Sequence, residues 1–112
     1  MKKILVAEDE ASIRAFVVVN LKHAGYTVTE AENGLQALQL FNAANGDFDV
    51  VLLDIMMPEM DGIATARKIR ERVGEEVTII ILTSFDFSEI EEEARAAGVD
   101  AFMAKPLFRS RL

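Results

Sequence analysis

Reactive side chains follow the predicted strands of this sequence, at the point where each strand ends. Glu8 and Asp9 come directly after the apolar run at residues 4–7, and Asp54 closes another apolar run. The residues found just after, or at the end of, a predicted strand are Glu8, Asp9, Asp54, Thr83 and Lys105. Because parallel sheets bind ligands beyond the carboxyl ends of their strands, we expect these side chains to gather at one edge of a sheet.

The three carboxylates of this group indicate a metal site. Carboxylates that lie close together repel one another, and a divalent cation removes that conflict. An oxygen-only ligand set without His or Cys suits Mg²⁺ or Mn²⁺, and Mg²⁺ binds through a few carboxylates together with water and phosphate. Glu8, Asp9 and Asp54 therefore predict a Mg²⁺ site, with Mn²⁺ as the alternative ion.

Taken singly, some of these residues have simpler interpretations. Asp9 could cap the following helix, and Lys105 before Pro106 could mark only the end of a strand. Asp54 is harder to explain in this way, because a charge beside four apolar residues is unfavourable without a partner. The hypothesis of a site depends on the joint position of these residues at strand ends.

Apolar runs alternate with helical stretches, which predicts a parallel sheet with crossover helices. The predicted strands lie at residues 4–7, 26–29, 49–54, 77–82 and 101–104. The predicted helices lie at residues 11–24, 35–45, 63–73 and 88–97. Apolar residues at helical spacing are Ile13, Val17 and Leu21 in the first helix, and Leu35, Leu38 and Phe41 in the second. No linker or repeat is present, so residues 1–112 are predicted to form a single domain.

The composition excludes several classes of function. The 112 residues carry 12 Lys and Arg against 19 Asp and Glu, and the net charge of −7 argues against direct nucleic-acid binding. The absence of Cys excludes disulfides, thiolate-bound metals and a cysteine nucleophile. No apolar run approaches the roughly 20 residues that span a bilayer. No signal peptide is visible, so we expect a cytoplasmic location without direct membrane contact.

Four segments resemble the motifs of the receiver domains of two-component response regulators. They are ILVAEDE at residues 4–10, VLLDIMMPEMDG at 51–62, LTS at 82–84 and FMAKP at 102–106. The resemblance covers essentially the whole chain, and residues 85–112 are also similar to receivers of hybrid sensor histidine kinases. It implies an α/β, flavodoxin-like, doubly wound fold whose five parallel strands have the order 2-1-3-4-5.

The resemblance implies that Asp54 is a phosphoacceptor in a two-component or phosphorelay system. Asp54 takes a phosphoryl group from the phosphohistidine of a histidine kinase or a histidine phosphotransfer protein. Glu8, Asp9, Asp54 and the backbone carbonyl of Met56 hold Mg²⁺, with Glu8 in place of the more common aspartate. Such a domain catalyses its own phosphorylation and dephosphorylation and turns over no external substrate.

Two residues beside the phosphate and one aromatic residue complete the implied mechanism. Lys105 pairs with a phosphoryl oxygen as a point charge, and the Thr83 hydroxyl donates to another. Thr83 then moves toward the phosphate and Phe102 turns inward, which changes the surface of the fourth helix and fifth strand. The peptide between Lys105 and Pro106 is expected to be cis. Phe102 has no hydroxyl, so a switch that requires a tyrosine hydrogen bond is excluded.

Two apolar residues of the first predicted helix fall outside its core-facing stripe. Phe16 and Val19 lie on the side and back of the helix when Ile13, Val17 and Leu21 face the core. Neighbouring elements could cover them. Alternatively, they form the docking surface for the partner's helical bundle, which is where receivers meet their partners.

Three other functions share features with this sequence. A flavodoxin-like flavin carrier needs a first loop that cradles a phosphate, and the acids at residues 8–10 would repel one. A phosphatase of the haloacid dehalogenase type needs an aspartate two residues after the nucleophile, where this chain has Met56. The third is a truncated or engineered receiver that acts mainly as a dimerisation or domain-swapping scaffold.

The end of the chain motivates that third alternative. A fifth helix is implied after Leu107, and the sequence stops at Leu112, about one helical turn later. An incomplete fifth helix would leave apolar surface beside the first helix and the fifth strand. Such a surface predicts a homodimer or an exchange of elements between two chains.

Overall fold

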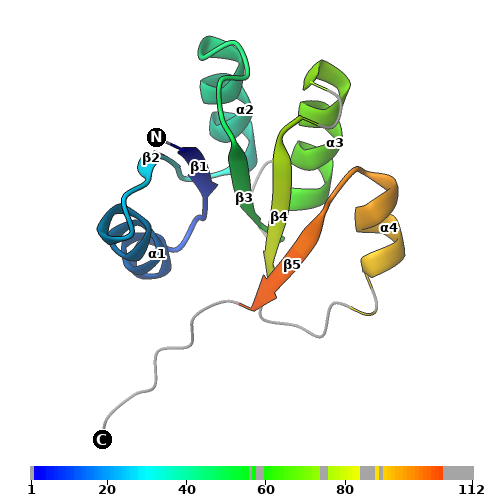
Figure 1. Ribbon diagram of the computed structural model, residues 1–112. Coiled ribbons are helices and arrows are strands. Elements are labelled where there is room, and N and C mark those ends of the chain that lie inside the picture. Colours follow the sequence, from blue (N-terminus) through cyan, green and yellow to red (C-terminus); the bar gives the residue numbers. More distant parts are fainter. Residues whose placement is uncertain are drawn as a thin grey trace, which may run out of the picture.

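The computed structural model describes residues 2–55, 57, 60–73, 76–83, 88 and 90–104. Strands and helices alternate along these residues, and the strands form one parallel sheet in the order β2-β1-β3-β4-β5 (Figure 1). In chain order the elements are β1 (Lys3–Ala7), α1 (Ala11–His23), β2 (Thr27–Ala31), α2 (Gly34–Ala43), β3 (Val50–Asp54), α3 (Gly62–Val73), β4 (Thr78–Thr83), α4 (Glu91–Ala96) and β5 (Ala101–Ala104). The predicted doubly wound α/β fold and its strand order are confirmed.

The element bounds agree closely with the sequence predictions except at the start of α4. The sequence predicts a helix over residues 88–97, and the described helix begins at Glu91. Ile90 precedes it, and its carbonyl accepts a hydrogen bond from the Ala94 amide at 2.9 Å. The predicted end is confirmed, because Gly98 follows α4 with a φ of +98°, a conformation that glycine adopts easily. No helix in the described part of the chain is long and apolar enough to cross a bilayer.

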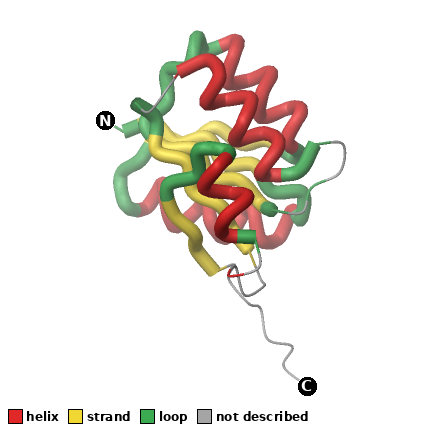
Figure 2. Tube along the Cα trace, turned by 90° about the vertical axis from the view of Figure 1, so that its right-hand side faces the viewer, coloured by secondary structure: helices red, strands yellow, loops and turns green. Residues whose placement is uncertain are grey.

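Helices cover both faces of the sheet (Figure 2). On one face α1 contributes Val18 to a cluster with Val6 and Leu52 of the strands. On the other face α2, α3 and α4 share a larger cluster, which includes the fully buried Phe41 and Ile69. Strands that are buried on both faces have nearly continuous apolar sequences, so they can be predicted from such runs.

The buried face of α1 differs from the prediction. Ile13 and Val18 are its buried residues, whereas Val17 and Leu21 are only partly buried. Residues 16–19 are all apolar, so helical spacing alone does not select one stripe among them. The packing of α1 against the sheet makes that selection.

An apolar groove of about 430 Å³ lies beside α1 among the described residues. Phe16 and Val17 of α1 line one side, and Ile4 and Met103 of the strands are among the residues that line the other. The predicted fifth helix after Leu107 lies outside the described residues.

Candidate functional site

The carboxyl ends of β1, β3 and β4 lie side by side at one edge of the sheet. The last residue of β1 is paired with Leu53 of β3, so Glu8 lies level with Asp54. On the other side Asp54 is paired with Leu82 of β4, so Thr83 comes one residue further along. The sheet order therefore places Asp54 between Glu8 and Thr83.

Glu8, Asp9 and Asp54 form a carboxylate cluster. One oxygen from each lies within 4.8 Å of the others. The side chains of Glu8 and Asp54 are fully buried, whereas Asp9 is exposed. Charges so close in a buried setting are unfavourable without a compensating ion. An all-oxygen donor set with one side open to solvent fits Mg²⁺, which retains water ligands.

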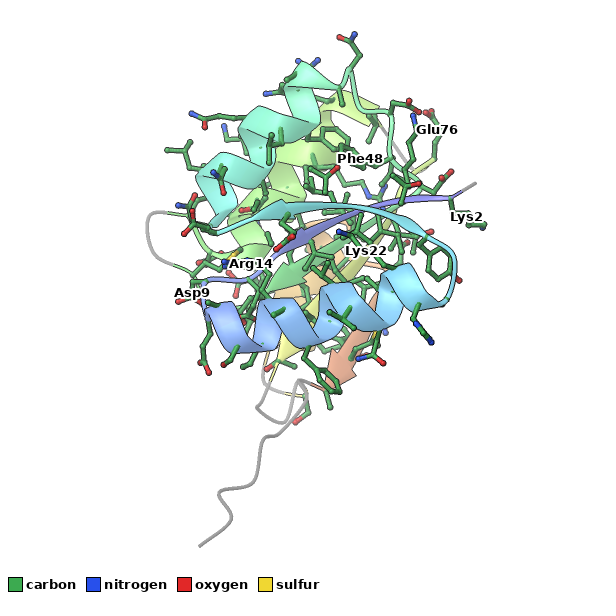
Figure 3. All side chains as sticks on the ribbon, turned by 90° about the vertical axis from the view of Figure 1, so that its left-hand side faces the viewer. Lys2, Asp9, Arg14, Lys22, Phe48 and Glu76 are labelled. Atoms are coloured by element: carbon green, nitrogen blue, oxygen red, sulfur yellow. The ribbon has the colours of Figure 1, made fainter. Side chains whose placement is uncertain are left out.

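Asp9 does not cap α1. The residue at the N-cap is Glu10, with an extended backbone at φ −86° and ψ 113°, and it makes no side-chain cap. Asp9 lies one residue earlier, at the same end of the helix as Arg14 (Figure 3). The simpler capping interpretation of Asp9 is therefore wrong, and its carboxylate is available to the cluster.

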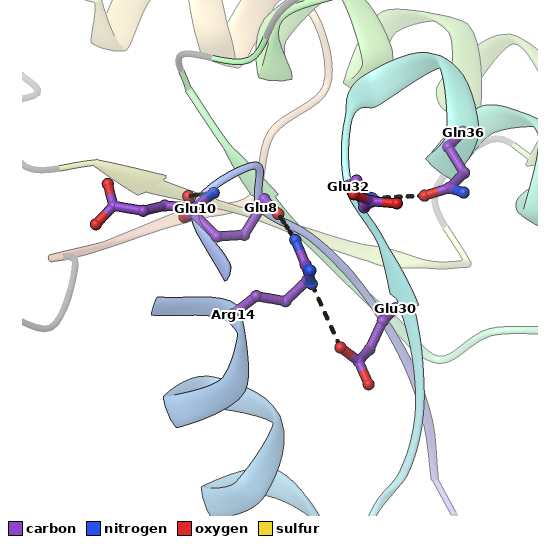
Figure 4. A network of polar contacts seen from close by, with 6 residues as sticks. All are labelled: Glu8, Glu10, Arg14, Glu30, Glu32 and Gln36. Carbon is purple, nitrogen blue, oxygen red and sulfur yellow. Dashed lines mark hydrogen bonds and ion pairs between the residues drawn. The ribbon is translucent and has the colours of Figure 1, made fainter. Parts of the chain in front are cut away.

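Arg14 of α1 fixes the loop that carries Glu8 (Figure 4). Its Nη1 donates to the backbone carbonyl of Glu8 at 2.6 Å, and its Nε forms an ion pair with Glu30 of β2 at 3.3 Å. The Glu8 carboxylate in turn accepts from the Glu10 amide at 3.1 Å. The sequence interpretation missed Arg14. A cation in the first turns of a helix is unfavourable toward the helix dipole, which was the signal that it needs acidic partners.

Gly62, the first residue of α3, packs directly against the end of β3. A Cβ at this position would lie 2.4 Å from the backbone carbonyl oxygen of Asp54. The Gly62 amide also donates to the Ile55 carbonyl at 3.2 Å, and the Ile55 amide donates to Leu82 of β4 at 3.0 Å. Only a residue without a side chain lets α3 approach the Asp54 backbone this closely.

We expect Gly62→Ala to destabilise the fold by about 1–3 kcal/mol, because the contacted atom is backbone and cannot rotate away. Urea unfolding measures this change, and amide chemical shifts report whether the Asp54 backbone moves. Gly25→Ala is the control, because a Cβ at Gly25 meets nothing within 4 Å while its φ of +99° is still strained for alanine. Unchanged Asp54 shifts in Gly62→Ala would contradict the packing argument.

Thr83 and Phe102 lie on the same face of the sheet. Phe102 of β5 is paired with Ile81, and Thr83 lies two residues beyond Ile81 on β4. Side chains two residues apart on a strand point to the same face. Thr83 is buried at the carboxyl edge beside Asp54, and Phe102 is partly buried against the larger cluster. The two side chains thus share a face, while the predicted movement of Thr83 and inward turn of Phe102 stay predictions.

The remaining predicted site residues divide into two groups. Met56, Lys105 and Pro106 lie outside the described residues, so the metal-binding carbonyl, the phosphate-pairing ammonium and the cis peptide stay predictions. Phe16 and Val19 are exposed on α1, at 47% and 63%. Neighbouring elements within the described part of the chain therefore leave both residues accessible.

Known proteins with similar sequences and those with similar structures belong to the same group, the response regulators. A family model described as the response regulator receiver domain matches residues 4–112. The transcriptional regulatory protein ResD of Bacillus subtilis is 40% identical over 104 residues, which are 93% of this chain and 42% of ResD. The receiver protein CpdR of Brucella abortus is 37% identical over 106 residues, which are 95% of this chain and 86% of CpdR.

Two solved structures are also similar. The chemotaxis protein CheY4 of Vibrio cholerae has a TM-score of 0.89 at 33% identity, covering 96% of this chain and 89% of that one. The response regulator TrrA of Thermotoga maritima, solved in complex with Mg²⁺-BeF, has a TM-score of 0.83 at 36% identity, covering 95% and 88%. The chain spans less than half the length of ResD. With a family model that matches nearly its whole length, the chain belongs to the response regulator receiver domain family of two-component systems.

Proposed function

We propose that Asp54 accepts a phosphoryl group from the phosphohistidine of a histidine kinase or histidine phosphotransfer protein. The main support for this proposal is the position of the Asp54 carboxylate. It is fully buried at the carboxyl edge of the sheet, and one of its oxygens lies within 4.8 Å of an oxygen of Glu8 and of Asp9. The complex of TrrA with Mg²⁺-BeF supports the proposal, because beryllofluoride resembles a phosphoryl group and TrrA is similar over most of this chain.

The transfer is a displacement at phosphorus. An oxygen of the ionised Asp54 carboxylate forms a bond to phosphorus as the phosphorus–nitrogen bond to the imidazole breaks, and the nitrogen keeps that electron pair. Glu8, Asp9, Asp54 and the Met56 carbonyl would hold Mg²⁺, or Mn²⁺ with the same ligand preference. When bound, the ion offsets negative charge on the carboxylates and the phosphoryl oxygens.

Residues on the neighbouring strands would bind and read the phosphoryl group. The Thr83 hydroxyl donates to one phosphoryl oxygen, and Lys105, directed by a cis peptide to Pro106, pairs with another. Thr83 then draws toward the phosphate, and Phe102 reorients on the same face of the sheet. This local event changes the α4 and β5 surface.

Beryllofluoride uptake by the wild-type chain tests this proposal. We expect a bound ¹⁹F NMR signal that requires Mg²⁺ and disappears when EDTA is added. Acetyl phosphate should label the protein under the same metal requirement. A wild type that takes up neither reagent in the presence of Mg²⁺ would overturn the phosphoacceptor function.

We propose that Phe16 and Val19 contact the phosphodonor protein. Phe16→Glu should slow transfer from a phosphorylated histidine phosphotransfer protein by about tenfold or more, since a charge replaces an interface aromatic. Its reaction with acetyl phosphate should be unchanged. Leu35→Glu is the matched control, because Leu35 is 40% exposed on α2, which packs on the opposite face of the sheet. Equal loss of both reactions in Phe16→Glu would contradict a docking role.

Self-association of the chain stays a prediction, supported by the apolar groove beside α1. Sedimentation at increasing concentration tests it, and a monomer throughout would refute it.

The similarity to ResD and CpdR gives no support to a receiver that serves only as a scaffold. A cytoplasmic location stays a proposal, as does the lack of direct nucleic-acid contact, which the net charge of −7 supports.

A further inference from the structure

Arg95 of α4 contacts the ring of Phe102. The guanidinium carbon lies 5.6 Å from the ring centroid, within the range of a cation–π interaction. Its Nε donates to Glu91, one helical turn earlier, at 3.0 Å, so the guanidinium contacts both a carboxylate and the ring. The side chains of Arg95 and Glu91 are about half exposed, at 52% and 42%. A contact of this kind at an exposed site favours the conformation that makes it by about two- to fivefold.

Arg95 lies toward the amino end of β5, whereas Thr83 lies at the carboxyl end of the neighbouring β4. Arg95 lines a pocket with Gly98, Val99 and Asp100, the residues that lead into the amino end of β5. Thr83 is at the carboxyl end of β4, beyond the residue that is paired with Phe102. A ring that turns toward Thr83 therefore turns away from Arg95.

We propose that Arg95 is a positioning residue that holds the Phe102 ring against α4 and opposes its reorientation toward Thr83. The inference rests on the proposed function, in which that reorientation accompanies phosphorylation. The phosphorylated and resting conformations differ by a population shift, and an interaction made in only one of them changes that balance by its full strength. Arg95 therefore sets how easily the switch moves.

Arg95→Gln tests the inference, because it removes the charge and keeps an unbranched polar side chain. In the metal-free and donor-free protein, we expect the nuclear Overhauser effect between the Phe102 ring and the Thr83 methyl group to increase. The apparent affinity for beryllofluoride with Mg²⁺ should rise by about two- to fivefold. Arg95→Lys should restore most of the wild-type behaviour, because it keeps a cation near the ring. Arg72→Gln removes the same charge from an exposed position of α3 and should change neither measurement.

A double-mutant cycle with Phe102→Leu separates the ring contact from a general effect of charge. Without the ring, adding Arg95→Gln should leave beryllofluoride affinity unchanged. The inference is overturned if Arg95→Gln matches the wild type in both measurements, or if its effect persists in the Phe102→Leu background. A wild type that binds no beryllofluoride would instead defeat the proposed function, and the ring measurement in the free protein would still decide whether Arg95 positions Phe102.

Discussion

Asp54→Asn should lower phosphoryl uptake from acetyl phosphate by about a thousandfold or more, as expected when a nucleophile is removed. An amide of nearly the same shape carries no negative charge, so it neither attacks phosphorus nor pairs with Mg²⁺ as a carboxylate does. Because Asp54 lies between Glu8 and Thr83, the substitution removes the central group of the site and leaves its neighbours in place. Mass spectrometry of the intact protein measures the uptake.

Asp49→Asn is the matched control, because Asp49 precedes the opposite end of the same strand. It is exposed and accepts a hydrogen bond from the Lys3 amide at 2.8 Å. We expect this variant to take up phosphate at the wild-type rate. Substantial labelling of Asp54→Asn, or equal loss in Asp49→Asn, would place the phosphoacceptor elsewhere.

The same pair of variants tests the charge conflict within the cluster. In EDTA, Asp54→Asn should raise the free energy of unfolding by about 1–3 kcal/mol, because it removes one of three carboxylates whose oxygens lie within 4.8 Å. Mg²⁺ should then stabilise the wild type more than the variant, since a ligand stabilises the form that binds it better. Asp49→Asn should show no gain in EDTA. A loss of stability in Asp54→Asn without metal would contradict the repulsion.

The sequence predicts those parts of the site that lie directly after the strands. In a parallel sheet the residues that follow the strands meet at one edge, so their positions in the sequence suffice to predict that Glu8, Asp9 and Asp54 lie together. Arg14 could not be found in this way. Its partners are a backbone carbonyl and Glu30, a residue 16 positions later on β2, and helical periodicity carries no information about either.

The packing faces of the helices were predictable only in part, for a related reason. Leu35 and Phe41 belong to one apolar stripe in the sequence, yet Leu35 is 40% exposed and Phe41 is fully buried. An apolar stripe predicts which face of a helix is turned toward the core. The burial of each residue on that face also depends on which side chains of other elements pack against it. The Phe41 ring stacks on Phe48, with centroids 5.9 Å apart, and this partner comes from the segment before β3.

Phe41→Ala should therefore destabilise the fold by about 3–5 kcal/mol, a large part of the total of a domain of this size. The substitution removes a fully buried ring from the cluster that α2, α3 and the sheet share, and the neighbouring side chains can fill only part of the space. Urea unfolding measures the loss. Phe16→Ala, the same change at a ring that is 47% exposed on α1, should lose less than about 1 kcal/mol. Equal losses of stability in the two variants would contradict the argument that burial of the Phe41 ring in the larger cluster stabilises the fold.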